Sequence, residues 1–143
     1  MRILGLSDAN ILGIHSMALI AASGERGISV HKIAEITKCS QHHLTKVVDT
    51  LSKEGIIYAT RGPAGGFHLN RPANEITLLE VYEAISGKVS GNEVCLSHTE
   101  SKIHLDFFEK VCKELSQKFL DYLRSTRLSD IQKKAEAILI KQA

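Results

Sequence analysis

Two short segments, residues 40–46 and 61–62, carry side chains whose chemistry suits the recognition of DNA. Gln41 can pair with adenine and Lys46 with guanine, and His42 or His43 can donate a hydrogen bond to a base or a phosphate. Arg61 opens the turn RGPAGG, and a basic residue beside glycine suits a narrow, electronegative minor groove. The alternative is that these side chains only form a solvated polar surface. The candidate DNA-binding residues are Ser40, Gln41, His42, His43, Thr45, Lys46, Arg61 and Gly62.

Cys95 and His98 form a second group of side chains that could bind a metal or react. They lie in the polar, glycine-containing stretch KVSGNEVCLSHTESK. A metal or iron–sulfur group needs about four donors, and these two side chains do not complete such a set. Three alternatives stay open, namely no cofactor, sensing by the Cys95 thiol, or a cluster or metal that uses further donors. Cys39, before a helix cap, and Cys112, within an apolar stripe, are at positions that favour packing over chemistry.

Patterns that would indicate catalysis are missing from the sequence. There is no Ser/His/Asp grouping, no paired set of carboxylates and no phosphate-binding glycine motif before a helix. The glycines of RGPAGG stand between two β-prone runs instead. The sequence therefore predicts a protein that is not an enzyme and has no catalytic residues.

The candidate DNA-binding side chains need a helix to present them, and the pattern predicts one after a tight turn. Ser29 is the expected N-cap of a helix over VHKIAEITK, and the link KCS leads to a second helix that begins near Ser40. Gly55 follows this second helix where a left-handed cap is expected. Its inward stripe is Leu44, Val47, Val48 and Leu51. Two helices joined so tightly predict a helix-turn-helix.

The turn RGPAGG predicts a β-hairpin directly after this helix. It separates the β-prone runs 56–60 and 67–70, and its glycines and Pro63 suit a hairpin tip. A hairpin in this place is the wing of a winged helix-turn-helix. Residues 29–71 also hold six Lys/Arg against three acids and four histidines, a bias that suits a polyanionic partner.

Helices are also predicted on both sides of the wing unit. Ser7 and Asp8 can cap a first helix whose apolar positions Ile11, Ile14, Ala18 and Ala21 repeat at three and four residues. Thr77 and Glu80 form a capping box that opens a helix to about residue 86. A last helix is expected to start at Ser129 and Asp130 and to point Ile131, Ala135, Ile138 and Leu139 inward.

A long apolar stripe precedes that last helix. It consists of Ile103, Phe107, Val111, Leu115, Phe119 and Tyr122, spaced by four or three residues. One small DNA-binding unit offers too little surface to cover it, so the stripe predicts a homodimer interface. The expected fold is mostly α with a small β-hairpin, namely a winged helix-turn-helix plus a long C-terminal dimerisation helix. The expected division is a DNA-binding domain over 1–87, then a sensor loop and dimerisation helices over 88–143.

The stretches IAEITKCSQHHLTKVVDTLSKEGII, RGPAGGFHLNRPANEITLLEVYEAISG and TRLSDI resemble the Rrf-type winged-helix repressors, the family that includes IscR, NsrR and CymR. The resemblance covers nearly the whole chain. It implies homodimers on palindromic promoter sites, with the third helix in the major groove and the wing in the minor groove. It also implies base-reading roles for His42, Thr45 and Lys46 and a wing role for Arg61.

The resemblance is weaker at the sensor. Members that hold an iron–sulfur cluster carry three cysteines in the loop before the long helix, whereas this loop has only Cys95. Some relatives take a ligand from the partner's first helix, a role that would fall to Asp8, Asn10 or His15. A cofactor is therefore unknown, and an iron–sulfur cluster remains one option although the usual three-cysteine set is absent.

The sequence as a whole predicts a sequence-specific transcriptional regulator. We expect a repressor that acts as a homodimer on double-stranded DNA at a palindromic operator and responds to a redox or iron–sulfur signal through Cys95. The alternative is a winged-helix protein-interaction module without DNA binding or cofactor. No apolar run reaches the length of a membrane span and MRILGLSDAN lacks the order of a signal peptide, so we expect a cytoplasmic protein without a membrane partner.

Overall fold

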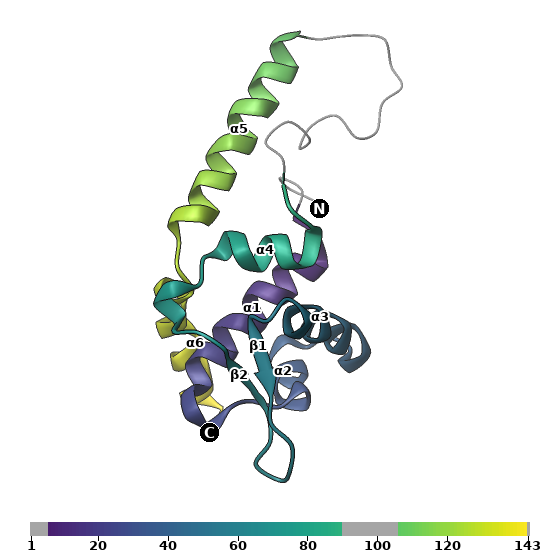
Figure 1. The fold of residues 1–143 in the computed structure, drawn as a ribbon, viewed down its shortest axis with the longest axis vertical. Coiled ribbons are helices and arrows are strands. Elements are labelled where there is room, and N and C mark those ends of the chain that lie inside the picture. Colours follow the sequence, from purple (N-terminus) through teal and green to yellow (C-terminus); the bar gives the residue numbers. More distant parts are fainter. Residues whose placement is uncertain (1–5, 90–105, 143) are drawn as a thin grey trace.

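The computed structural model describes residues 6–89 and 106–142 of the 143-residue chain. The described part is mostly helical with one two-stranded antiparallel hairpin, as expected from the sequence. The elements are α1 (Asp8–Ser23), η1 (Gly24–Arg26), α2 (Val30–Thr37), α3 (Gln41–Lys53), β1 (Ile57–Ala59), β2 (Phe67–Leu69), η2 (Ala73–Glu75), α4 (Leu78–Ser86), α5 (Asp106–Ser125) and α6 (Leu128–Lys141). Helix α5 projects from a body that the other elements form (Figure 1).

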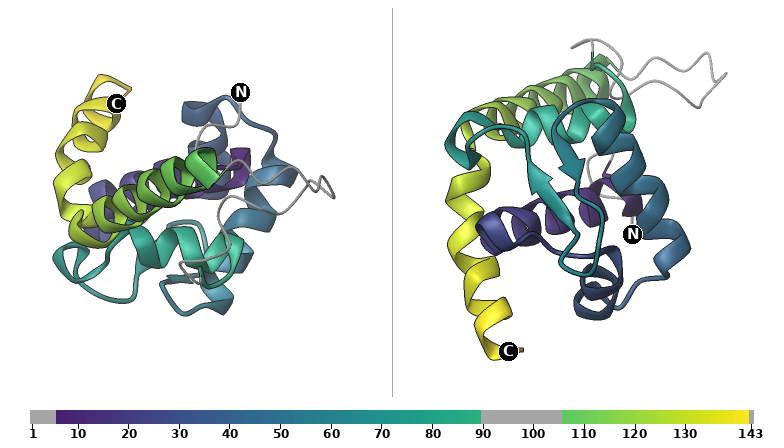
Figure 2. Two further views of the ribbon diagram at one scale, coloured as in Figure 1. Left: turned by 90° about the horizontal axis from the view of Figure 1, so that it is seen from above. Right: turned by 60° about the horizontal axis from the view of Figure 1, so that its bottom comes forward.

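Helix α1 is the centre of the body. It packs against α3 and α4 and also along α6, and Figure 2 shows α6 returning beside it. Because neighbours lie on several sides, α1 buries Leu12, Met17 and Ile20 rather than one narrow stripe. Of the apolar positions that repeat along this helix, Ile11 is 42% exposed.

Helix α4 begins with the predicted capping box. The Thr77 hydroxyl accepts the Glu80 N–H at 3.1 Å, and a Glu80 carboxylate oxygen accepts the Thr77 N–H at 2.8 Å. Arg71 donates to the other Glu80 oxygen at 2.6 Å. Burial acts to raise the Glu80 pKa, but the bonds from Thr77 and Arg71 outweigh it and hold the pKa below its ordinary value. The ionised carboxylate therefore ties the end of the wing to α4.

The start of α6 differs from the prediction. Arg127, not Ser129, is the N-cap residue, and the Asp130 carboxylate accepts the Arg127 N–H at 2.7 Å. Ala135 is buried as expected, whereas Ile138 is 43% exposed, so its predicted inward position is wrong. The physical reason is that α1 covers only the flank of α6 that contains Ala135.

The base of α5 is fixed to α4 through the turn that leads into α6. Leu78 N–H donates to Thr126 O at 3.0 Å, and Leu128 N–H donates to Ile76 O at 2.8 Å. Phe119 packs edge-on against Tyr82 with ring centroids 5.8 Å apart. These contacts hold the C-terminal end of α5 within its own protomer.

Along α5, the predicted stripe contains both exposed and partly buried residues. Leu115 and Tyr122 are 50% and 64% exposed, and Val111 is half-buried. Ile103 and the side chain of Phe107 lie outside the described residues. The dimer interface therefore stays a prediction, and in the described part of α5 only Phe119 among the stripe residues has a resolved partner in the protomer core.

Candidate nucleic-acid interface

The polar face of α3 is set by the burial of its opposite face. Leu44, Val48 and Leu51 have no exposed surface, and Val47 keeps only 5%. This fixes the rotation of the helix about its axis. The exposed residues of the helix and its cap include every candidate in the segment, namely Ser40, Gln41, His42, His43, Thr45 and Lys46.

The start of α3 is defined by its cap. The Ser40 hydroxyl accepts the His43 N–H at 3.2 Å, as the sequence predicts. The Thr45 hydroxyl donates to the Gln41 carbonyl at 2.8 Å. Each hydroxyl thus makes one bond within the helix, and the Gln41 amide, the histidine rings and the Lys46 ammonium are further exposed polar groups of this face.

The turn between α2 and α3 depends on one residue with an unusual backbone. Ser29 caps α2 by accepting the Lys32 N–H at 3.2 Å, and Ile33 is fully buried. Lys38 then adopts a left-handed conformation, with φ 54° and ψ 33°. A left-handed residue stops the helix within one position, which produces the tight link that a helix-turn-helix requires.

The hairpin confirms the predicted wing, with strands shorter than the β-prone runs. Tyr58 pairs with His68, and Thr60 N–H donates to the Gly66 carbonyl at 2.9 Å to close the loop. Within this loop Gly65 N–H donates to Gly62 O at 2.9 Å. Gly62 has φ +105°, a conformation that favours glycine, and Arg61 beside it is exposed.

A contact that the sequence analysis missed anchors the wing to the helix-turn-helix. Ile28 and Phe67 form an antiparallel bridge: the Ile28 nitrogen lies 3.3 Å from the Phe67 oxygen, and the Phe67 nitrogen lies 2.8 Å from the Ile28 oxygen. A Cβ on Gly66 would approach the Ile28 backbone to 2.8 Å, so the close approach requires glycine there. A single apolar residue between Gly27 and the cap Ser29 was the only local signal, and one residue is too short to show strand periodicity.

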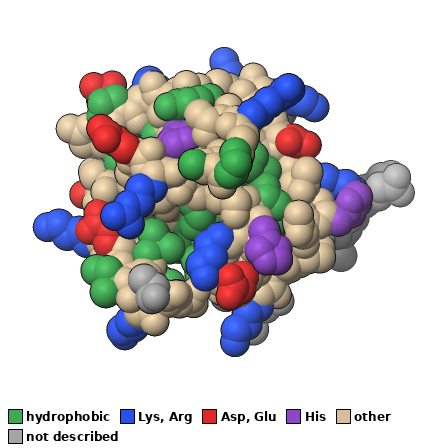
Figure 3. Space-filling model, turned by 90° about the horizontal axis from the view of Figure 1, so that it is seen from below, with side chains coloured by type: hydrophobic (Ala, Val, Ile, Leu, Met, Phe, Trp, Pro, Cys, Tyr) green, Lys and Arg blue, Asp and Glu red, His purple; other side chains and the backbone are tan. Residues whose placement is uncertain are grey.

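The basic charge of this region is partly neutralised within the chain. Lys32 pairs with Glu35 at 2.9 Å, and this hydrogen bond lowers the Glu35 pKa. Arg71 is held by Glu80. Among the described residues, the cations of segment 29–71 that make no ion pair are Lys38, Lys46, Lys53 and Arg61. Figure 3, seen from the wing end, accordingly shows basic and histidine side chains with acidic ones between them.

The predicted sensor residues Cys95 and His98 lie outside the described residues. Cys39 packs against the core as expected, with its sulfur 3.1 Å from the Thr37 hydroxyl, and Cys112 is half-buried. No three His, Cys, Asp or Glu side chains gather as a metal site within the described ranges. The described residues therefore do not supply a donor set for an iron–sulfur group.

The α1 residues named as possible cluster ligands differ in their surroundings. Asp8 and His15 are exposed. Asn10 is fully buried, donates to the Ser86 hydroxyl at 2.6 Å and accepts from Ser7 at 2.9 Å. Asn10 thus joins the start of α1 to the end of α4, and its amide is already engaged.

Comparison with known proteins places this architecture. The family of iron-dependent transcriptional regulators called Rrf2 matches residues 6–134. The chain belongs to the Rrf2 family. It is therefore a DNA-binding transcriptional regulator and not an enzyme, as the sequence predicts.

Individual Rrf2 relatives agree with this placement. The transcriptional regulator IscR of Cereibacter sphaeroides is 29% identical over 136 residues, which cover 86% of this chain and 81% of that protein. The structure of CymR, described as the global cysteine regulator of B. subtilis, superposes with a TM-score of 0.76 at 22% identity and covers 92% of this chain and 98% of its own. An oxidized form of Staphylococcus aureus CymR gives 0.71 at 25% identity, with 92% and 96% covered.

The Rrf2 fold is thus confirmed by both sequence and structure. In the described part of this Rrf2 chain, no helix is both long and apolar enough to cross a bilayer.

Proposed function

We propose that the protein is a homodimeric repressor that binds a palindromic operator, with α3 in the major groove and the wing in the minor groove. The observation that carries this proposal is the exposed polar face of α3 next to a wing that is joined to the same unit through Ile28 and Phe67. The cap at Ser40 and the closed loop at Thr60 give both elements a defined geometry. A preformed reading surface of this kind loses little conformational entropy on binding.

The contacts of α3 follow from which of its groups remain available. Gln41 and Lys46 present an amide and an ammonium that suit adenine and guanine, and the His42 and His43 rings can donate to a base or phosphate. The Thr45 hydroxyl donates its proton within the helix, so its oxygen can only accept from a base, while its methyl group suits the methyl of thymine. Ser40 contributes by capping the helix, while Gly62 allows the turn that presents Arg61.

The dimer is proposed to form through α5. The exposed Leu115 and Tyr122, with Val111 beside them, continue the stripe of Ile103, Phe107 and Phe119. A twofold dimer sets the spacing of two recognition helices and thereby the spacing of palindromic half-sites. We also propose that the boundary between the DNA-binding domain and the sensor and dimerisation part lies between residues 87 and 88. Helix α6 belongs to the second part but packs on α1, so it attaches the end of the chain to the DNA-binding unit.

Substitution of the wing arginine tests this function. DNA selected from random sequences by the wild-type protein serves as the operator, and affinity is measured by fluorescence anisotropy at fixed salt. Arg61→Ala should weaken binding by roughly 1–3 kcal/mol, the range of a specific base contact. Lys133→Ala removes an exposed cation from α6 and is the matched control that should change little.

Two results would count against the function. Equal affinities for Arg61→Ala and Lys133→Ala would remove the wing from the interface. Failure of the wild-type protein to enrich any DNA sequence would favour the alternative, a protein-interaction module built on the same fold.

Regulation through Cys95 is a separate part of the proposal. The oxidized form of a CymR relative supports redox chemistry in a similar protein. We expect Cys95→Ser to keep basal DNA binding but to lose its response to oxidant, nitric oxide or iron limitation, whereas Cys39→Ser and Cys112→Ser keep the response. The measurement is DNA affinity before and after treatment, with iron and sulfide content determined on anaerobically purified protein. A wild-type protein that shows no response would remove Cys95 as a sensor.

A further inference from the structure

A groove of about 530 Å³ lies where α1, α2 and α6 meet. Its surface is formed mainly by Ile14, Ala18, Leu19, Ile36, Ile131 and Ile138. Small-molecule sites commonly have volumes of about 300–1,000 Å³ and mostly apolar walls. The groove therefore has the size and the lining of a ligand site.

The groove exists because the residues at its floor are small. Ala18 on α1 and Ala135 on α6 are both buried, and neither extends far enough to occupy the space between the helices. Ile138 at the edge is consequently 43% exposed, and Ile14 and Ile131 are only half-buried. Covering this apolar surface would be favourable by about 25 cal/mol for each Å² removed from water.

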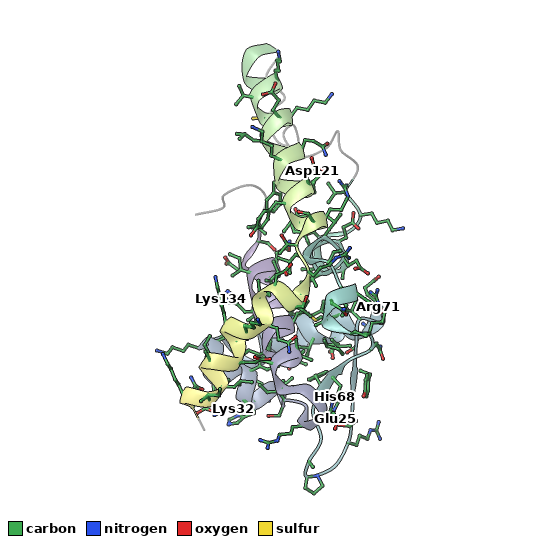
Figure 4. All side chains as sticks on the ribbon, turned by 90° about the vertical axis from the view of Figure 1, so that its left-hand side faces the viewer. Glu25, Lys32, His68, Arg71, Asp121 and Lys134 are labelled. Atoms are coloured by element: carbon green, nitrogen blue, oxygen red, sulfur yellow. The ribbon has the colours of Figure 1, made fainter. Side chains whose placement is uncertain are left out.

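Lys134 is the charged side chain among the described residues that line the groove. His15 comes from α1, Thr37 from α2 and Lys134 from α6, and no acidic side chain is among the lining residues. The Thr37 hydroxyl already donates to the Ile33 carbonyl at 2.8 Å. Neither His15 nor Lys134 makes an ion pair within the described ranges. Figure 4 shows Lys134 on α6, on the side of the body away from Arg71.

We propose that this groove binds a small amphipathic carboxylate. The apolar part of the ligand lies among Ile14, Ile36 and Ile131, and its carboxylate lies between His15 and Lys134. One ammonium group beside apolar walls is complementary to a molecule that combines an alkyl or aryl body with one negative charge. The ammonium of Lys134 and a ring N–H of His15 both donate, as a carboxylate requires.

The position of the groove connects the ligand with DNA binding. Ile36 and Thr37 belong to the last turn of α2, directly before the left-handed Lys38 that sets the turn into α3. A ligand that bridges α2 and α6 can change DNA affinity only by binding the two states of the helix-turn-helix with different affinity. This regulatory step rests on the proposed function, whereas the binding step does not.

Binding is tested first, without DNA, on the full chain. Octanoate, octanol and octylamine share one alkyl chain and differ in charge, so they separate charge selection from nonspecific hydrophobic contact. Isoleucine methyl NMR should show saturable shifts of Ile14, Ile36 and Ile131 with octanoate, with octanol and octylamine binding roughly two- to fivefold more weakly. No saturable shifts with millimolar octanoate, or equal affinity for all three compounds, would overturn the proposal.

A charge reversal identifies the group that selects the anion. Lys134→Glu should weaken octanoate binding roughly five- to tenfold and favour octylamine. Lys133→Glu makes the same change at an exposed neighbour outside the groove and should leave the order of affinities unchanged. Equal effects of the two variants would mean that only the overall charge matters and would overturn the site. Both lysines are exposed, so neither substitution should unfold the protein and any difference reports on binding.

The same titrations distinguish other occupants and other failures. Methyl shifts that follow protein concentration instead of octanoate would show a second copy of the chain in the groove, which overturns a ligand site. Operator affinity is then measured with and without octanoate. Octanoate binding without any DNA binding by the protein would defeat the proposed function alone, and DNA binding without octanoate binding would defeat this inference alone. If both bind and affinity is unchanged, the regulatory step is wrong.

Discussion

Helices α3 and α5 carry similar apolar stripes, but the stripe of α3 is buried whereas part of the stripe of α5 is exposed. In α3 the four stripe residues are 5% exposed or less, because α1, α2 and α4 surround them within one chain. In α5 the exposed fractions of Leu115 and Tyr122 are 50% and 64%. The comparison teaches that the chain completes the core around α3 by itself, whereas Leu115 and Tyr122 on α5 stay exposed.

The largest effect is expected from a charge on the exposed part of α5. Leu115→Glu should weaken dimerisation by about 3–6 kcal/mol, because the twofold interface loses two buried leucines of about 1.5–3 kcal/mol each. The protomer should remain folded, since Leu115 is not part of its core. Sedimentation velocity and circular dichroism measure the two properties.

Phe119→Glu sharpens that test from the same helix. Phe119 packs edge-on against Tyr82 of its own chain, so this variant should lose stability of the protomer as well as dimerisation. A dimeric Leu115→Glu protein at micromolar concentration would show that α5 is not the interface.

The next effect belongs to the core of α3. Leu44→Ala should lower the free energy of unfolding by about 2–5 kcal/mol, because Leu44 is fully buried and its truncation leaves a cavity. Urea denaturation of dilute protein measures the change. Leu115→Ala removes the same atoms from a half-exposed site and should cost less than about 1 kcal/mol under these conditions. Similar costs for the two variants would contradict the difference between the helices.

The smallest effect concerns the ionised capping box. Glu80→Gln keeps an oxygen for the Thr77 N–H but removes the charge opposite Arg71, so it should cost up to about 1 kcal/mol at pH 7. The pKa of Glu80 is lowered in the folded state, so the ionised group stabilises the fold above its ordinary value of 4.5.

This stabilisation should disappear as the pH falls through the lower folded-state pKa. The difference between wild type and Glu80→Gln, measured by urea denaturation, should therefore shrink from pH 5 downward. The control Glu75→Gln changes an exposed acid outside the capping box. A difference that persists unchanged at low pH would mean that the charge of Glu80 contributes nothing.

Local signals in the sequence were sufficient for most helix starts and for the wing. The caps at Ser7, Ser29, Ser40 and Thr77 are all confirmed, because each depends on a side chain and a backbone N–H three residues later. The last helix is the exception, since Asp130 bonds back to Arg127 and leaves Ser129 inside the helix. The expected start at Ser129 and Asp130 therefore lies just inside the observed helix, which begins at Leu128.

The candidate DNA-binding residues could be found from the sequence because their exposure follows from one stripe. Once Leu44 and Val48 face inward, the 3.6-residue period turns Gln41, Thr45 and Lys46 toward solvent. The charge available there could not be predicted in the same way. Whether a cation is free or paired depends on neighbours distant in sequence, as for Arg71 and Glu80.

The sequence by itself determined the helix-turn-helix and the wing, because caps, periodicity and glycine turns act over a few residues. The Rrf2 family followed from the resemblance of whole stretches of the chain to other members. Only the tertiary structure decided that Ile28 bridges to Phe67, that Ile11 and Ile138 stay exposed, and that small residues of α1 and α6 leave a groove. These features depend on which elements far apart in the chain come to lie side by side. Periodicity identifies an apolar face, but the element that covers it is selected by packing among all the helices at once.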